Sequence, residues 1–187
     1  MLKRTLIPIF LLAIARVPAH ADAVDLSLIP PSGVIEGSPG SVIGWGYSIT
    51  NNTADWLLAT NLDAGLFPLD VTPLNIFDFP EIAPGATVSE SFSTAVTAAC
   101  PGPPCGLYEL TLGAVTPGDS FSGAFDISVD RYDNDPFNGG NFLGSAPDLT
   151  ADFNVIYTAT PEPGTLLSVA TVLGLLGARK LRLSLRR

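Results

Sequence analysis

Large apolar side chains alternate with small or polar residues through much of the middle of the chain. The clearest case is the segment 41–50, in which every second position carries a large side chain. These side chains are Ile43, Trp45, Tyr47 and Ile49. Because successive side chains of a β-strand point to opposite faces, the pattern is typical of a strand with one face in a core. The segments 121–132 and 152–159 alternate in the same way.

Turn-forming stretches such as "PPSG", "SPG", "APG" and "TPG" separate the alternating segments. Gly and Pro supply the backbone angles that tight turns need. The spacing predicts seven or eight strands, at 24–29, 41–50, 56–60, 65–71, 87–96, 107–114, 121–132 and 152–159. So many short strands predict an all-β fold, a single antiparallel β-sandwich over residues 22–160.

Three longer stretches carry a resemblance to a known class of domain. They read "GSPGSVIGWGYSITNNT", "IAPGATVSESFS" and "GLYELTL". In their order and turn chemistry they resemble bacterial immunoglobulin-like modules. The resemblance implies an immunoglobulin-like sandwich, and it says nothing about activity because such sandwiches serve many functions.

The first residues have the order of parts found in a secretory signal. A basic start, "MLKR", precedes an apolar stretch, and Ala19, His20 and Ala21 follow as an Ala-x-Ala pattern. This order predicts a signal-peptide helix over 1–21, cleaved between Ala21 and Asp22. The alternative is a buried N-terminal helix. Cleavage would also remove the single histidine of the chain.

Near the C-terminus, residues 165–178 carry no charge. A membrane-spanning helix needs about 17–20 apolar residues, so this stretch spans only if neighbouring basic side chains snorkel. Arginines close the chain, and the positive-inside rule keeps such a cluster on the cytoplasmic side. The body would then lie outside, in agreement with the signal peptide.

Pro161, Glu162 and Pro163 stand directly before this hydrophobic segment. The motif, the segment and the basic end resemble the tail of the PEP-CTERM family of exported bacterial proteins. The resemblance implies that an exosortase-type enzyme recognises residues 161–187 and removes the segment. The body would then reach the cell envelope, the outer surface or the exterior, in bacteria that make extracellular polysaccharide. A plain, uncleaved membrane anchor is the alternative.

Charge is divided sharply along the chain. All eighteen acidic residues lie between Asp22 and Glu162, where Arg131 is the single cation, so this part carries −17. Such a body repels nucleic acid and anionic lipid. Without His or Lys it also lacks the base of a Ser-His-Asp or Cys-His mechanism. Paired carboxylates could still hydrolyse glycosides, but no spacing selects two of them. We therefore expect a protein that is not an enzyme.

Cys100 and Cys105 flank four residues, three of them prolines. After export into an oxidising compartment, such a pair usually forms a disulfide. With four intervening residues the pair does not have the spacing of a Cys-x-x-Cys redox motif. We predict a structural disulfide.

The stretch "DRYDNDPFNGG" offers oxygen ligands in a loop between two strands. Calcium favours six to eight such oxygens. The candidate ligands are Asp130, Asp133, Asp135 and Asn138. Their spacing is not that of an EF-hand, and the alternative is a solvated acidic loop. No other cofactor is indicated.

Aromatic residues supply one further candidate, a platform that binds sugar rings. The residues considered are Trp45, Tyr47, Trp56, Phe77 and Phe79. Trp45 lies in mid-strand and is expected in the core, which leaves Trp56 and the "NIFDF" loop as the candidates for an exposed surface. The sequence thus predicts an exported, non-catalytic protein of structural or adhesive role. The alternative is a carbohydrate-binding module, with or without calcium, that acts on extracellular polysaccharide.

Overall fold

The computed structural model of the protein describes residues 23–159. The predicted signal peptide, its cleavage site at Ala21 and Asp22, and the sorting signal at 161–187 lie outside these residues. Among the residues described, no helix has the length and apolar character that crossing a membrane requires.

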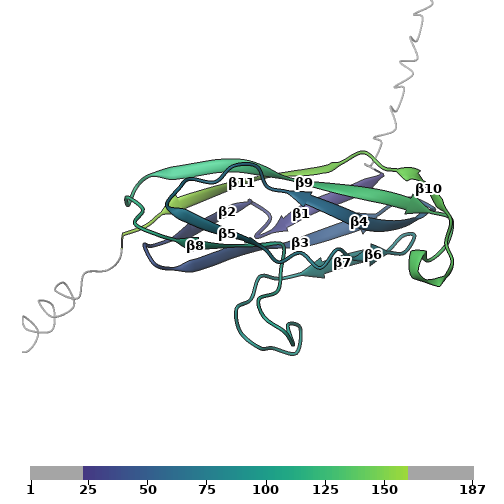
Figure 1. The fold of residues 1–187 in the computed structure, drawn as a ribbon, viewed down its shortest axis with the longest axis horizontal. Coiled ribbons are helices and arrows are strands. Elements are labelled where there is room, and N and C mark those ends of the chain that lie inside the picture. The colour runs from purple at the N-terminus through teal and green to yellow at the C-terminus, as the bar shows by residue number, and fades with distance from the viewer. Residues whose placement is uncertain (1–22, 160–187) are drawn as a thin grey trace, which may run out of the picture.

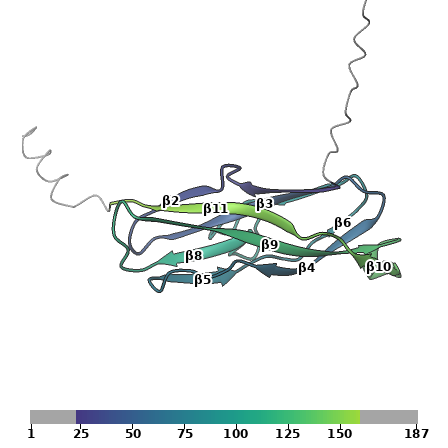
Figure 2. The same ribbon diagram turned by 90° about the horizontal axis from the view of Figure 1, so that it is seen from above.

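Two β-sheets form the two layers of the described chain (Figures 1 and 2). The first sheet contains β1 (Val24–Ile29), β3 (Val42–Asn51), β5 (Val71–Asn75), β7 (Thr87–Glu90) and β8 (Tyr108–Leu112). The second contains β2 (Val34–Gly37), β4 (Trp56–Asp63), β6 (Glu81–Ile82), β9 (Ser120–Tyr132), β10 (Phe142–Ser145) and β11 (Leu149–Tyr157). A short 3₁₀ helix, η1 (Pro136–Asn138), lies between β9 and β10. The prediction of an all-β fold is confirmed.

Strand pairing differs from the prediction at one edge. The strands run in the order β1-β3-β8-β5 in the first sheet and β2-β11-β9-β4-β6 in the second. All pairs are antiparallel except β2 with β11, which run parallel. Between β1 and β2 the chain passes from one sheet to the other, and Gly33 adopts φ +67° at the crossing. A Cβ there would lie 2.3 Å from the carbonyl oxygen of Asp152, so only glycine fits.

Strands β7 and β8 lie end to end along the same edge of β3. The segment 91–107 between them leaves the sheet and projects from the two layers (Figure 1). The predicted strand at 87–96 therefore ends early, at Glu90. The chain can cross β3 here because Gly44 and Gly46 have no side chains. A Cβ on Gly46 would lie 2.2 Å from the carbonyl oxygen of Glu90, and one on Gly44 2.5 Å from the ring of Phe92.

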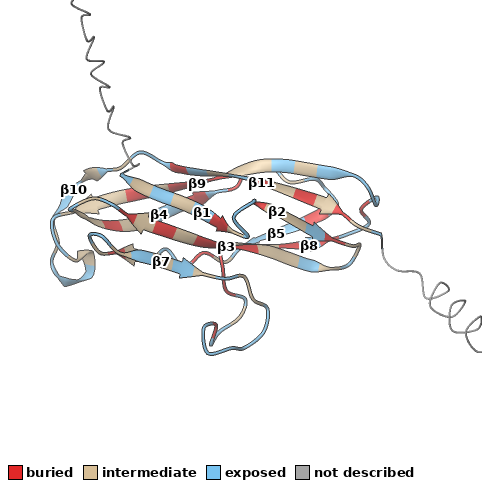
Figure 3. Ribbon diagram, turned by 180° about the vertical axis from the view of Figure 1, so that it is seen from behind, coloured by how far each residue is buried: buried red, intermediate tan, exposed pale blue. Residues whose placement is uncertain are grey.

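Aromatic side chains from both sheets fill the space between the layers, where Figure 3 shows the buried positions on the strands. Trp45 is fully buried and meets Phe125 at 5.2 Å and Phe153 at 4.9 Å between ring centroids. Its Nε1 donates to the carbonyl oxygen of Gly33 at 2.9 Å, so burial leaves no donor unpaired. The alternation predicted for β3 is confirmed, since Tyr47 and Ile49 are buried with Trp45.

The strand predicted at 65–71 is wrong, and β5 begins only where it was expected to end. Gly65 has φ +66°, which breaks an extended segment, and Leu66 and Leu69 are fully exposed. Phe67 turns inward instead and stacks on Tyr108, with 5.4 Å between ring centroids. Pro73 within β5 is tolerated because this strand forms the edge of its sheet.

The close approach of the Glu90 backbone to Gly46 predicts that a side chain at this position destabilises the fold. In Gly46→Ala the new methyl group must displace the backbone at Glu90, so we expect a loss of about 1–3 kcal/mol in the free energy of unfolding. Gly102→Ala is the matched control, because nothing lies within 4 Å of its Cβ position. Denaturant unfolding of both variants measures the difference, and equal stabilities would contradict the packing described.

Candidate functional site

The predicted calcium ligands lie around η1, but each carboxylate is already engaged by a local partner. Asp133 accepts hydrogen bonds from the backbone and the side-chain amide of Asn141, at 2.7 and 2.9 Å. Asp135 caps η1 by accepting from the backbone nitrogens of Phe137 and Asn138 and from the Asn138 side chain. In both cases the side-chain amide is the main reason that the pKa of the carboxyl is lowered.

Asp130 lies apart from these two loop carboxylates, on β9, and accepts from the Ser145 hydroxyl at 2.8 Å. Within residues 23–159, no group of three or more His, Cys, Asp or Glu side chains converges in a way that could hold a metal ion. Of the four predicted ligands, Asp135 and Asn138 bond to one another, while Asp133 and Asp130 bond to Asn141 and Ser145. In the described chain they stabilise the turn between β9 and β10.

Glu81 on β6 contacts the same loop. Burial raises the pKa of Glu81, and the neighbouring Asp135 carboxylate raises it further through its charge and a hydrogen bond. The Oε2 atom of Glu81 is buried without a hydrogen-bond partner.

Three aromatic residues lie side by side on neighbouring strands near this loop. Trp56 on β4 pairs in register with Tyr132 on β9, and Tyr132 pairs with Phe142 on β10. Directly opposed residues of antiparallel strands share a face. Leu57 and Val129, on the alternate positions, are buried in the core, so these three side chains point outward. We call Trp56, Tyr132 and Phe142 the aromatic row.

The aromatic row is most accessible at Phe142. Phe142 is 58% exposed, and its ring meets that of Tyr132 at 5.8 Å and 69°. Trp56 and Tyr132 are partly buried, and neither of their polar atoms is among those that are buried without a partner in residues 23–159. Trp45, whose Nε1 bonds inside the core, shows the opposite arrangement.

The structure divides the other aromatic candidates between the core and the surface. Phe77 is buried and packs edge-on against Tyr47, with 5.0 Å between ring centroids. Phe79 is 37% exposed and lies 5.0 Å from Phe77. The "NIFDF" loop therefore serves mainly to cover Tyr47, and of the residues considered only Trp56 belongs to the aromatic row.

Carboxylates cover the outward side of the second sheet, which we call the acidic face. The outward positions follow from strand register and from the burial of the alternate residues. Its carboxylates are Glu36, Asp63, Glu81, Asp126, Asp130 and Asp152. Asp63 and Asp126 are directly opposite one another on β4 and β9. Like charges in that arrangement are destabilising, so the face carries an unbalanced negative field.

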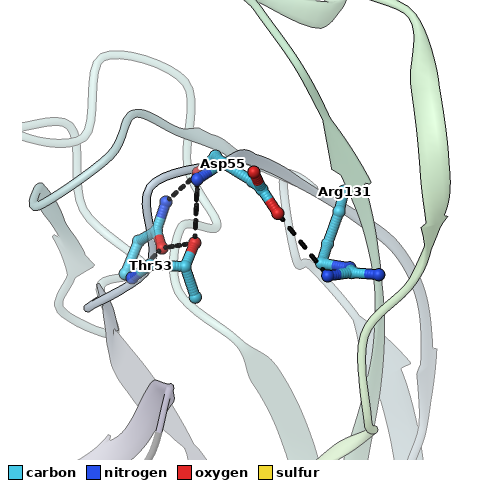
Figure 4. A network of polar contacts seen from close by, with 4 residues as sticks. Thr53, Asp55 and Arg131 are labelled. Atoms are coloured by element: carbon cyan, nitrogen blue, oxygen red, sulfur yellow. Dashed lines mark hydrogen bonds and ion pairs between the residues drawn. The ribbon is translucent and has the colours of Figure 1, made fainter.

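Arg131 is the single cation among residues 23–159 and alternates away from the acidic face. Its guanidinium lies 3.5 Å from the Asp55 carboxylate, and its Nε is buried without a partner (Figure 4). Because the pair is partly exposed, it contributes little to stability.

The Asp55 turn is held by a buried amide. Asn51 is fully buried; its Nδ2 donates to the carbonyl oxygens of Asp55, Ile82 and Ala83, and its Oδ1 accepts from Thr53. This amide belongs to the "NNT" sequence, which fits the pattern for N-glycosylation but here forms a packed turn.

Beside Arg131 a groove of about 620 Å³ opens between β1 and the segment leading into β11. Its polar lining residues are Asp25, Thr53, Arg131, Ser145, Asp148 and Thr150. One cation, two carboxylates and three hydroxyls line it together, a mixture that specifies no particular ligand.

Cys100 and Cys105 form the predicted disulfide, with 5.8 Å between their Cα atoms. It lies in the projecting segment 91–107, where Ser93 and Cys105 exchange backbone hydrogen bonds at 3.0 Å. The bridge closes the base of an exposed loop that has little core of its own.

A second polar cluster surrounds the buried side chain of Tyr47. The Tyr47 hydroxyl donates to Asp78 at 2.5 Å, and burial together with that carboxylate raises the pKa of Tyr47 far above its ordinary value. Glu90 faces Tyr47 across the strand pair. Burial raises the pKa of Glu90, the charge of Asp78 adds to the increase, and a hydrogen bond from the Gly106 backbone opposes it.

No family model matches the chain, and no curated protein matches it. Among solved structures, the VesB protease of Vibrio cholerae is similar at a TM-score of 0.41 and 11% sequence identity. The likeness covers 72% of this chain and 32% of the protease, so the chain spans about a third of that protein's length. At this level it carries no argument about activity.

Of the aromatic row, the sequence predicted only Trp56 as a surface aromatic residue, and it did not predict Tyr132 or Phe142. Tyr132 lies at an outward position of β9, a strand that was predicted correctly. The alternation of side chains along this strand could therefore have placed Tyr132 on the surface. Phe142 gave no comparable signal. It lies on the four-residue strand β10, whose register with β9 is shifted between Phe142 and Gly144.

The cluster around Glu90 makes a pH prediction. Because the pKa of Glu90 is higher in the folded state, this group favours folding fully below its unfolded-state value of about 4.5, and the contribution is lost as pH rises through the folded-state pKa. Glu90→Gln should therefore be more stable than the parent at about pH 7, by less than about 1 kcal/mol because solvent screens the charge. The difference should vanish at about pH 3. Denaturant unfolding at both pH values measures it, and a variant that is less stable at the higher pH would contradict the prediction.

Proposed function

We propose that the protein is an exported, non-catalytic component of the cell envelope or extracellular matrix, with a structural or adhesive role. The observation that carries the proposal is the disulfide Cys100–Cys105, which belongs to an oxidising compartment outside the cytoplasm. The predicted signal peptide supplies the route of export. The tail at Pro161, Glu162 and Pro163 supplies sorting by an exosortase-type enzyme, with the C-terminal segment as a transient membrane anchor.

The strand arrangement supports an immunoglobulin-like sandwich for the body. The first strand is split between the sheets, with β1 on β3 and β2 parallel to the last strand, β11. The two layers each carry a central long strand, β3 and β9, as sandwich domains on cell surfaces do. A sandwich of this kind presents loops and sheet faces to partners and needs no catalytic site.

The chemistry of the body supports a non-catalytic role. Between residues 23 and 159 there is neither His nor Lys. The carboxylates of Asp133 and Asp135 accept hydrogen bonds from the neighbouring amides of Asn141 and Asn138. The carboxylates of the described residues thus suit a role as hydrogen-bond acceptors in binding, and no His or Lys in this range could activate a catalytic nucleophile.

Export and sorting can be tested on protein recovered from the native host. Mass spectrometry of secreted or surface material should find an N-terminus at Asp22 and no peptide from the segment beyond Pro163. Without reduction, Cys100 and Cys105 should resist alkylation. An N-terminus at Met1, or Arg187 present in secreted protein, would contradict the proposal. Export with the tail intact in the cell membrane would favour a permanent anchor.

A second candidate function is carbohydrate binding, and the aromatic row is the observation that favours it. Aromatic faces stack on the apolar faces of sugar rings, and carboxylates and amides accept hydrogen bonds from hydroxyls. The aromatic row joins both kinds of group, since Asp130 and Ser145 form the adjacent cross-strand pair. The expected ligand is extracellular polysaccharide.

A glycan array screened with calcium and with EDTA tests this candidate. We expect binding that persists in EDTA, because the loop carboxylates are occupied by Asn138 and Asn141. Binding that requires calcium and is lost in Asp133→Asn would show instead that the loop rearranges around a metal ion. Absence of binding under both conditions would reject carbohydrate recognition and leave the structural role.

A further inference from the structure

The aromatic row stands at one end of the acidic face, and together they specify a ligand class. We propose that this surface binds a polysaccharide that carries free amino groups. The sugar rings would stack on the aromatic row, and the ammonium groups would pair with carboxylates of the acidic face. The inference rests on the second candidate function and names its site and its substrate class.

Geometry supports stacking at the aromatic row. The three residues follow one another on adjacent strands, which lie about 4.8 Å apart, so the row spans about 10 Å from Trp56 to Phe142. The rings of Tyr132 and Phe142 are inclined by 69° in an edge-type contact, so they do not form one flat plane.

Polar groups accompany the aromatic row. Asp130, two residues before Tyr132, accepts a hydrogen bond from the Ser145 hydroxyl at 2.8 Å through Oδ1. Trp56 and Tyr132 each carry a polar group, an indole N–H and a phenol hydroxyl, that can bond to a sugar hydroxyl. A carboxyl group and two such groups beside aromatic rings are the combination that orients a sugar in a site.

Charge selects the class of polysaccharide. The described chain carries sixteen carboxylates against one guanidinium, a net charge of −15. Six of these carboxylates lie on the acidic face, and Arg131 alternates away from it. An anionic polymer is repelled by this field, and a neutral one gains nothing from it. A polymer with ammonium groups gains at every carboxylate and relieves the repulsion between Asp63 and Asp126.

The acidic face extends along the whole of β9. Asp130 lies two residues before Tyr132 and Asp126 four residues further, and Asp152 continues the line on β11. The cross-strand partner of Asp152 is Ala124, so no bulky side chain interrupts the face there. A linear polymer lying along β9 would cross the aromatic row at Tyr132 and meet carboxylates beyond it.

Co-sedimentation with an insoluble polysaccharide tests the proposal. One β-linked polymer is used in two forms, fully N-acetylated and partly deacetylated, so that only the free amino groups differ. We expect retention by the deacetylated form, with weaker retention as the salt concentration rises. Phe142→Ala, at an exposed edge position, should weaken binding on the order of tenfold.

Charge variants test the second half of the site. The double variant Asp63→Asn and Asp126→Asn should bind the deacetylated polymer more weakly and lose part of its salt dependence. Glu109→Gln with Asp119→Asn removes the same charge elsewhere and is the control. Leu74→Ala, on the first sheet and 48% exposed, is the control for Phe142→Ala. Thermal unfolding confirms that each variant is folded.

The outcomes separate the inference from the function on which it rests. Retention of the deacetylated form that falls in both site variants and in neither control supports the proposal. Equal retention of both forms at all salt concentrations, still lowered by Phe142→Ala, rejects the amino-sugar class and keeps carbohydrate binding. If the polymer is retained equally by the parent, by Phe142→Ala and by the double charge variant, this surface is not the binding site. If neither form nor any glycan on the array binds, both the inference and the second candidate function are wrong.

Discussion

The buried amide of Asn51 is the contact on which the arrangement of the two sheets depends. Its side chain reaches the turn into β4 through Asp55 and the end of β6 through Ile82 and Ala83, and its oxygen accepts twice from Thr53. Its backbone bonds to Gly85 and Ala86 as well. One residue therefore fixes where the chain leaves the first sheet and where it joins the second. A buried amide with every group satisfied specifies a single geometry in a way that apolar packing does not.

Elsewhere the apolar core supplies cohesion, and the polar groups mostly shape loops. Trp45, Phe125 and Phe153 interlock between the sheets, and Trp45 also anchors the crossing at Gly33 through its indole nitrogen. The acidic residues are spread over the surface, where water solvates them. A strongly negative body of this kind resists self-association and stays soluble at high concentration.

The strands with regular alternation could be predicted from the sequence, as β1, β3 and β9 show. What failed was decided by contacts distant in sequence. The segment 65–71 looks extended, but Phe67 packs inward against Tyr108 and pulls the chain out of any sheet. Strand β7 stops at Glu90 because the chain crosses β3 over two glycines. The calcium ligands stay a prediction: the sequence supplies the oxygen atoms, and the structure shows Asp135 and Asp133 accepting hydrogen bonds from the nearby amides of Asn138 and Asn141. The aromatic row escaped notice because it exists only across three strands and is not contiguous in the chain.

The length of β9 has a consequence for how the body is displayed. Its first residue, Ser120, lies in register with Ile156, close to where the described chain ends at Ala159, and its last, Tyr132, belongs to the aromatic row. Thirteen extended residues separate these two poles by about 40 Å. Whatever holds the protein by residues beyond Ala159 holds it at the pole opposite the aromatic row (Figure 1). The two sheets then separate the aromatic row from that point by the full length of β9.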